Sequence, residues 1–273
     1  MRAKTNRHGL SRYISSDVKR EVRKRSGFGC VVCGNAFYTY EHIDPPFKDA
    51  TEHNPNHMAL LCGTCQFRSS ARNLSKDSIK QASKNPKCLQ EGFSFGLLDV
   101  GVEYPRVIIG SLEVIETTNI IRVFGNPVLC VDPPEQQGGP FRLSAVLTDS
   151  EGKEILYIDE NEWQAPTANW DVEVTGQYIK VRRALRDIPL ILKMEAPTGI
   201  VVEKLNSYYD GVKVVCQEGR PLSVEYPNKL VLETKNARLR GCKSAIDIFD
   251  DVYIGCDCKE ATMSELRIDN LEN

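Results

Sequence analysis

Two pairs of cysteines constrain the fold of this chain more than any other feature. Cys30 and Cys33 form one Cys-x-x-Cys pair, and Cys62 and Cys65 form the second. Each pair can present two thiolates to one ion, and four thiolates in a tetrahedron are the ligand set of a structural zinc site. The alternative is that these are four buried free thiols, but free thiols would have no reason to occur as two pairs with the same spacing. The spacing therefore predicts Zn²⁺ bound by these four cysteines.

The charge of the chain is divided between two parts. Residues 1–90 contain 16 Lys and Arg against 7 Asp and Glu, whereas residues 91–273 contain 19 against 30. All four histidines lie in the first part, so any histidine chemistry must occur there. The basic part is suited to a polyanion such as nucleic acid, and the acidic part is not. We therefore expect two modules with different partners.

The first part has the pattern of helix, strands, loop and helix. Ser16 or Asp17 can cap a short basic helix that ends before Gly27, and its charges suit either phosphate contact or a solvated surface. Residues 28–43 predict two short strands joined at the first cysteine pair. Residues 44–56 have the composition of a loop, and the segment after Cys65 is expected to be partly helical as far as Asn85-Pro86.

The second part has the pattern of an all-β domain. From about Val107, short β-type runs recur at a spacing of roughly 8–12 residues, separated by Gly, Pro, Asn and Asp. Polar and apolar residues alternate in residues 178–182 and 229–234, as in half-buried antiparallel strands. We expect a sandwich or a barrel. A β-solenoid is the alternative, although no repeat of fixed period is present.

Residues 15–85 resemble the HNH endonucleases in the order of their motifs. The matching motifs are Cys30–Cys33, Glu41-His42-Ile43, Asn56–Cys62 and Cys62–Cys65. The resemblance implies a ββα-metal fold, in which a hairpin packs against a helix, often beside a four-cysteine zinc site. The second part is similar to the β-rich tails of some bacterial HNH proteins, a likeness that implies no activity.

The resemblance also implies roles for Glu41 and His42, which lie between the two cysteine pairs in the sequence. His42 would be the general base that activates water, and Glu41 would be a ligand of a catalytic Mg²⁺ or Mn²⁺. A carboxylate oxygen suits such hard cations, and a neutral imidazole can accept a proton. An exposed loop dipeptide without function is the alternative reading of this pair.

The chain departs from the HNH pattern at two positions. His57 stands where the family commonly has Asn, and Gln66 stands where it commonly has a metal-binding His. A glutamine can bind a metal only through its neutral amide oxygen, a weaker donor than imidazole for transition metals. The catalytic metal site is therefore expected to be weakened, with Gln66 as ligand, or rebuilt with His57.

The remaining cysteines and histidines match no motif. We interpret His8 and His53 as surface residues. Cys256 and Cys258 resemble a metal pair, but scattered structural thiols fit all six remaining cysteines better, because no histidine is nearby. Trp163 and Trp170 fit a core better than a ligand-stacking surface.

The expected fold class is therefore α+β. It comprises a zinc-bound ββα-metal module in residues 1–90, a connector in residues 91–106 and an acidic β-rich sensor or oligomerisation domain in residues 107–273. The expected function is metal-dependent endonuclease action on DNA, and a bacterial, defence-related setting follows only from the family. The alternative is an inactive zinc-stapled DNA-binding or assembly protein. We expect a cytoplasmic location with reduced thiols, because neither a secretion signal nor an apolar run long enough to span a membrane is present.

Overall fold

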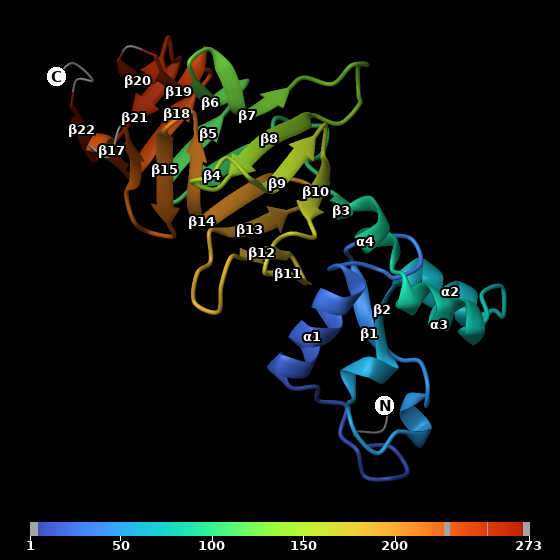
Figure 1. Ribbon diagram of the computed structural model, residues 1–273. Helices are drawn as coiled ribbons and strands as arrows, with labels where there is room; N and C mark the ends of the chain where they lie inside the picture. Colours follow the sequence, from blue (N-terminus) through green and yellow to red (C-terminus); the bar gives the residue numbers. More distant parts are fainter. Residues whose placement is uncertain (1–4, 227–229, 250, 270–273) are drawn as a thin grey trace. The chain divides into compact units, whose positions relative to one another are not determined.

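The computed structural model describes residues 5–226, 230–249 and 251–269 (Figure 1). The outer ends of the two expected modules, residues 1–4 and 270–273, lie outside the described residues. The chain divides into two compact units. Unit 1 comprises Met1–Gly96 and Ala165–Thr175, and unit 2 comprises Leu97–Gln164 and Gly176–Asn273. Unit 1 therefore includes residues 165–175, which are far from its other residues in the sequence. The sequence instead predicted a first module in residues 1–90, a connector in residues 91–106 and a second module from residue 107.

Unit 1 contains the helices of the described chain and few strands. Its elements are α1 (Ser16–Ser26), β1 (Tyr38–His42), η1 (Phe47–Asp49), η2 (Pro55–His57), β2 (Met58–Cys62), α2 (Gly63–Ser70), α3 (Lys76–Lys84), α4 (Lys87–Glu91), β3 (Phe93–Leu97) and β11 (Asp171–Thr175).

The predicted basic helix is confirmed as α1. Gly27 ends it in the left-handed conformation, at φ +69°, and its N–H bonds back to the last turn. Val22 is fully buried and packs in one cluster with Met58 and Leu60 of β2. The helical segment expected after the second cysteine pair is confirmed as α2 and α3.

The expected pair of strands within residues 28–43 is only half right. Cys30 to Cys33 form a tight turn, in which Gly34 N–H donates to Cys30 O at 2.8 Å. Gly34 has φ +85°, which interrupts an extended chain. The run curls because both thiols must reach one point. The remaining strand, β1, pairs antiparallel with β2, with Tyr38 opposite Cys62 and His42 opposite Met58.

Unit 2 consists of strands. They are β4 (Arg106–Ile109), β5 (Leu112–Ile115), β6 (Asn119–Val123), β7 (Asn126–Asp132), β8 (Arg142–Thr148), β9 (Glu154–Asp159), β10 (Glu162–Pro166), β12 (Tyr178–Arg182), β13 (Leu190–Glu195), β14 (Gly199–Tyr209), β15 (Val212–Gln217), β16 (Leu222–Glu225), β17 (Leu230–Lys235), β18 (Ala237–Arg240), β19 (Ser244–Ile248), β20 (Val252–Cys256), β21 (Glu260–Thr262) and β22 (Glu265–Ile268).

These strands form a nearly closed, barrel-like sheet, so the expected all-β part and its barrel form are confirmed at this level (Figure 1). Most neighbours are antiparallel hairpin partners, as in the meander from β12 to β17. Among the pairings whose register the structure describes, parallel ones join segments far apart in the sequence, namely β4 with β14, β5 with β18 and β6 with β19. These parallel pairings bring strands from the first part of unit 2 against strands from its second half.

Alternation of buried and exposed side chains was expected in residues 178–182 and 229–234, and it is present only in the first of these segments. In β12, Ile179 and Val181 are fully buried and their neighbours are not. In β17, Val231 and Leu232 are both buried. The register between β16 and β17 shifts at Val224/Glu225, so two consecutive residues of β17 point inward. Lys229, the first residue of that expected run, lies outside the described residues.

Candidate functional site

Four cysteines of unit 1 converge on one point. The turn before β1 positions Cys30 and Cys33, β2 ends at Cys62, and the first turn of α2 carries Cys65. Their sulfur atoms all lie within 4.8 Å of one another. Within the described residues, no other group of three or more metal-ligating side chains gathers in this way. The predicted four-cysteine cluster is therefore present, and it could hold a metal ion.

The thiols of this cluster influence each other's ionisation. The pKa of Cys30 is lowered, chiefly by a hydrogen bond from Cys33, and the pKa of Cys33 is raised by the same contact. Burial raises the pKa of Cys65. Four adjacent thiols cannot all ionise without a neighbouring positive charge. A bound divalent cation would supply that charge, as thiolate sites require.

Glu41 and Gln66 lie together beside the cluster. Gln66, one residue after Cys65 in α2, donates a hydrogen bond from Nε2 to Oε1 of Glu41. Thr39 Oγ1 donates to the same carboxylate oxygen at 3.1 Å. Thr39 and Glu41 are two apart in β1 and share one face of the hairpin. The two residues expected to be metal ligands are thus in contact with each other.

His42 contacts a second histidine that the motif comparison did not single out. His42 Nε2 lies 3.1 Å from His53 Nδ1, and the other ring nitrogen of His53, Nε2, lies 2.8 Å from the carbonyl oxygen of Ser11. His53 is half-buried rather than fully exposed, and it lines the same cavity as His42. Burial lowers the pKa of His42, and His53 lowers it further, while a hydrogen bond to the backbone of Glu52 opposes both effects.

A cavity of about 610 Å³ connects these side chains. Glu41, His42, His53 and Gln66 all line it, and so do the cationic side chains of Arg12 and Lys76, the ring of Phe47 and the hydroxyls of Ser69 and Ser70. The Arg12 guanidinium lies 4.5 Å from the centroid of the Phe47 ring. The cavity therefore combines a carboxylate, imidazoles, an amide and cations, a set suited to a phosphate ester and a cation.

His57 is not part of this cavity. It is exposed at the end of η2 and lines a separate cavity of about 600 Å³ together with Asp44 and Lys80. Asp44 and Lys80 form an ion pair at 2.6 Å. Of the candidate ligands, the structure brings Glu41 and Gln66 together and leaves His57 elsewhere.

A buried ion pair contacts one residue of the cavity lining, Tyr40. Arg23 of α1 binds Asp171 of β11 through two hydrogen bonds, at 2.8 and 2.7 Å, and its Nη1 donates to the hydroxyl of Tyr40 at 2.8 Å. Tyr40 in turn lines the cavity. Next to this pair, the guanidinium of Arg20 lies 3.4 Å from the ring centroid of Trp170. The segment 165–175 therefore holds α1 and, through it, one wall of the cavity.

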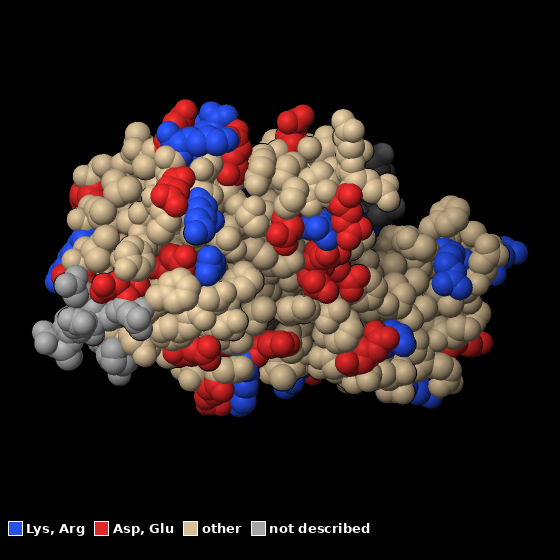
Figure 2. Space-filling model, turned by 90° about the horizontal axis from the view of Figure 1, so that it is seen from above, with Lys and Arg blue, Asp and Glu red and all other residues tan. Residues whose placement is uncertain are grey.

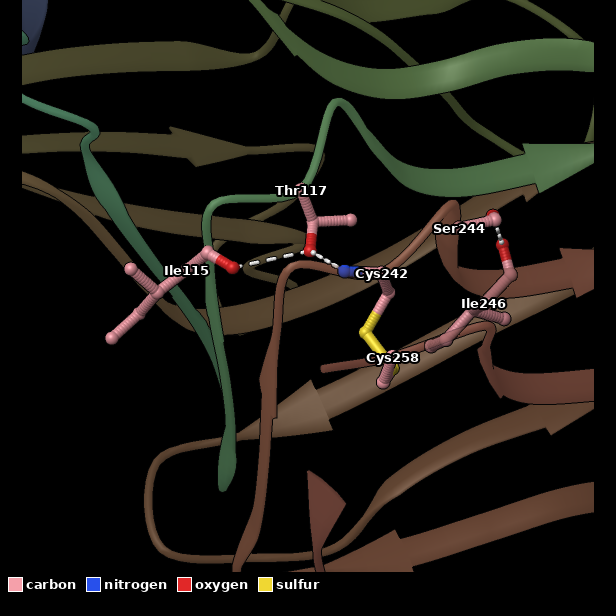
Figure 3. The surroundings of a disulfide bond; sticks show 6 residues. All are labelled: Ile115, Thr117, Cys242, Ser244, Ile246 and Cys258. Carbon is pink, nitrogen blue, oxygen red and sulfur yellow. Dashed lines mark hydrogen bonds between the residues drawn. A yellow bond between two sulfur atoms is a disulfide. The ribbon is translucent and has the colours of Figure 1, made fainter. Parts of the chain in front are cut away.

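The cysteines of unit 2 differ from expectation at two positions. Cys242 and Cys258 form a disulfide, so the interpretation of both as free thiols was wrong (Figure 3). Thr117 holds the adjacent backbone, since its hydroxyl accepts from Cys242 N–H and donates to Ile115 O, each at 3.1 Å. Parallel pairing of β5 with β18 and of β6 with β19 brings these segments together, which no local sequence pattern indicates.

Neither a protein-family model, nor a curated protein, nor a solved structure matches this chain. Among the residues that the structure describes, no helix combines the length and apolar character needed to cross a membrane. Trp163 is fully buried in unit 2, as expected of a core residue.

Proposed function

We propose that the chain is a metal-dependent endonuclease of the HNH type that hydrolyses phosphodiester bonds of DNA. The observation that carries the proposal is the cavity in which Glu41, His42 and Gln66 meet beside the four-cysteine cluster. The resemblance assigns these three positions to catalysis. The basic charge of residues 1–90 supports a polyanionic substrate.

The four cysteines are assigned to a structural Zn²⁺. A closed set of four thiolates leaves no position open for substrate, so this site stabilises the fold and takes no part in chemistry. Because such a site forms together with the fold, removing one thiolate should release the metal and unfold unit 1. Metal analysis should find about one zinc per chain, and Cys62→Ser should lose it.

The catalytic cation is assigned to Glu41 and Gln66. Their oxygens fit a hard ion such as Mg²⁺ or Mn²⁺, which commonly uses one or two protein oxygens and completes its shell with water and phosphate. Amide oxygen and nitrogen exchange places by a half-turn of the side chain, so Gln66 can present its oxygen beside Glu41. A cation there would stabilise the charge that develops on the phosphate.

The protein side chains perform the remaining steps. His42 takes a proton from the attacking water, which requires the neutral imidazole that its lowered pKa favours. Arg12 and Lys76 attract and orient the phosphate from the cavity wall. The products are a 5′-phosphate and a 3′-hydroxyl, as the resemblance implies.

The β-rich unit 2 is assigned to sensing, self-assembly or recruitment of a protein partner. On the face drawn in Figure 2, acidic side chains cluster with Lys and Arg side chains beside them. Charges within unit 2 also pair with each other, as Arg142 does with Glu135 and Glu160. Its net acidic charge disfavours a second DNA surface. We assign the protein to the cytoplasm.

One observation favours a second candidate function, a catalytically inactive zinc-stapled DNA-binding or assembly protein. Gln66 satisfies the carboxylate of Glu41 through a hydrogen bond. A carboxylate already paired in this way has less need of a cation. The same fold would then bind DNA without cutting it.

Plasmid cleavage in the presence of Mg²⁺, Mn²⁺ or Ni²⁺ separates these functions. Cleavage by wild type that requires millimolar cation would support a weak catalytic metal site with Gln66 as ligand. In that case, Gln66→His should tighten metal binding and raise the cleavage rate, most clearly with Mn²⁺ or Ni²⁺. His57→Ala is the matched control and should change neither. Cleavage by Gln66→His alone would establish the inactive alternative. The assignment of the site would be contradicted if Gln66→His, like His57→Ala, changed neither the metal affinity nor the cleavage rate.

A further inference from the structure

A second cavity of unit 1, of about 600 Å³, adjoins the catalytic cavity, which is the 610 Å³ cavity of the proposed active site. Ile43 lines both cavities, and helix α3 forms part of the wall of each. Lys76, the first residue of α3, lines the catalytic cavity, whereas Lys80 and Lys84 line the second cavity. The two cavities are therefore neighbours along α3.

The three lysines of α3 are spaced for contact with a DNA strand. They recur at every fourth position, so they lie along one side of the helix. At about 1.5 Å per residue, Lys76 and Lys84 are separated by about 12 Å along the helix axis. A strand of duplex DNA advances by about 3.4 Å per nucleotide, so this separation corresponds to roughly three or four nucleotides. A strand whose reacting phosphate lies beside Lys76 can thus place another of its phosphates beside Lys84.

The charges that line the second cavity are mostly positive. Arg25 of α1, Lys80 and Lys84 supply three cations, and Asp44 is the one carboxylate among the described lining residues. Asp44 is bound to Lys80 at 2.6 Å, so these two charges balance each other. Arg25 and Lys84 are exposed, and within the described part of the chain neither of them forms an ion pair. Two positive charges therefore remain available to an anion.

Part of the remaining lining of the second cavity is apolar. Val31, Met58 and Pro86 are buried in its wall, and the side chain of Leu89 is 48 % exposed. A free phosphate ion gains nothing from such side chains, whereas the deoxyribose units between the phosphates of DNA present C–H groups to them. Cations together with an apolar surface therefore fit a sugar–phosphate backbone better than a small anion.

We propose that the second cavity binds the backbone of the DNA strand at roughly three or four nucleotides from the cut, with Arg25 and Lys84 neutralising its phosphates. This assignment rests on the proposed function, since it takes the catalytic cavity as the place of the reacting phosphate. Phosphate contacts fix the register of a strand without reading its bases. The site therefore adds affinity and orients the strand along α3 without a sequence preference.

Equilibrium binding of a labelled duplex oligonucleotide to the full-length, zinc-containing chain tests the site apart from cleavage, because no Mg²⁺ or Mn²⁺ is added. Arg25→Gln/Lys84→Gln should weaken binding by roughly 5- to 30-fold at about 0.15 M salt. The slope of log K against log[salt] should become shallower by about 0.9 or 1.8, for one or two phosphates no longer neutralised. Lys24→Gln/Lys48→Gln removes the same charge from exposed residues that line neither cavity, and should leave the slope nearly unchanged.

Asp44→Asn gives a change in the opposite direction, which a damaged fold would not produce. It frees Lys80 from its ion pair, so it should tighten binding and steepen the slope by up to about 0.9. Equal effects of the two double variants, or no effect of Arg25→Gln/Lys84→Gln, would overturn the proposal. Failure of wild type to bind the duplex, or no tightening by Asp44→Asn at unchanged zinc content, would overturn it as well.

Cleavage kinetics separate the second cavity from the catalytic one. Arg25 and Lys84 contact the strand equally in the ground state and in the transition state, so their replacement should raise KM by about the same factor as Kd and leave kcat within roughly two-fold. A fall in kcat with unchanged KM would overturn the proposal. A wild type that binds DNA as expected but cuts none would contradict the proposed nuclease activity and still support DNA binding by the second cavity.

Discussion

At the scale of single residues, Gln66 and His53 show what a motif can and cannot predict. The resemblance to HNH endonucleases implied a site made of Glu41, His42 and Gln66 or His57, and the first three line one cavity in the structure whereas His57 does not. It could not find His53, because the loop between His42 and Met58 has no fixed spacing from which a contact could be deduced. The only sign in the sequence that His53 lies near the site is its place in the loop between the two cysteine pairs.

The pH dependence of cleavage follows from the surroundings of His42. Its pKa lies below the usual value of about 6.5, because burial and His53 disfavour the charged ring. A general base works only when unprotonated, so the rate should fall as the pH drops through this lowered pKa. We expect the acidic limb of kcat/KM against pH to lie below pH 6.5.

His8→Ala serves as the control for this profile, since His8 is exposed and lies outside the cavity. It should leave the limb in place. An acidic limb at or above the ordinary histidine value would show that another group controls the rate.

At the scale of elements, helix α1 could be predicted and its partner could not. Gly27 marks its C-terminal end in the sequence, whereas the expected N-cap was wrong, because Ser16 and Asp17 lie inside the helix and Ser15 caps it without a side-chain hydrogen bond. Its buried contact with Asp171 joins residues 148 positions apart, and nothing in the local pattern of residues 165–175 separates them from unit 2. The strand expected at the first cysteine pair was wrong for a similar reason, since the demand of four converging sulfurs overrides local strand propensity.

The stability of unit 1 should depend strongly on the Arg23–Asp171 pair. The two side chains are 4 % and 1 % exposed, so removing one partner leaves a buried, unpaired charge. We expect Asp171→Ala to lower the free energy of unfolding by about 3–5 kcal/mol. The double variant Arg23→Met/Asp171→Leu should recover most of this loss, because no charge is left buried. Urea unfolding followed by fluorescence measures both.

Lys153→Ala is a suitable comparison, because its ion pair with Glu151 is exposed on both sides. It should have no measurable effect. An equally small effect of Asp171→Ala would show that residues 165–175 do not hold unit 1 together.

At the scale of the whole molecule, the sequence predicted a helical, cysteine-clamped part and an all-β part. Turn residues and alternating runs indicate strands, but the parallel pairings that complete the barrel-like sheet of unit 2 depend on contacts between distant segments. The disulfide lies among these segments, and this explains why the sequence pattern did not reveal it.

The state of the cysteines can be counted. We expect eight reactive thiols in the denatured, chelator-treated protein and all ten after reduction, since only Cys242 and Cys258 are joined. Purification with thiols blocked at lysis prevents oxidation afterwards. Ten thiols before reduction would contradict the disulfide between Cys242 and Cys258.

The most direct test of the account is the rate of DNA cleavage by wild type and His42→Ala under single-turnover conditions, with equal zinc content and matched unfolding curves. His42 is not a ligand of the four-cysteine cluster, so its removal should leave the fold intact. We predict metal-dependent cleavage by wild type and a loss of at least ~10²-fold in His42→Ala, the usual contribution of a positioned general base. Cleavage by His42→Ala at the wild-type rate would contradict the account.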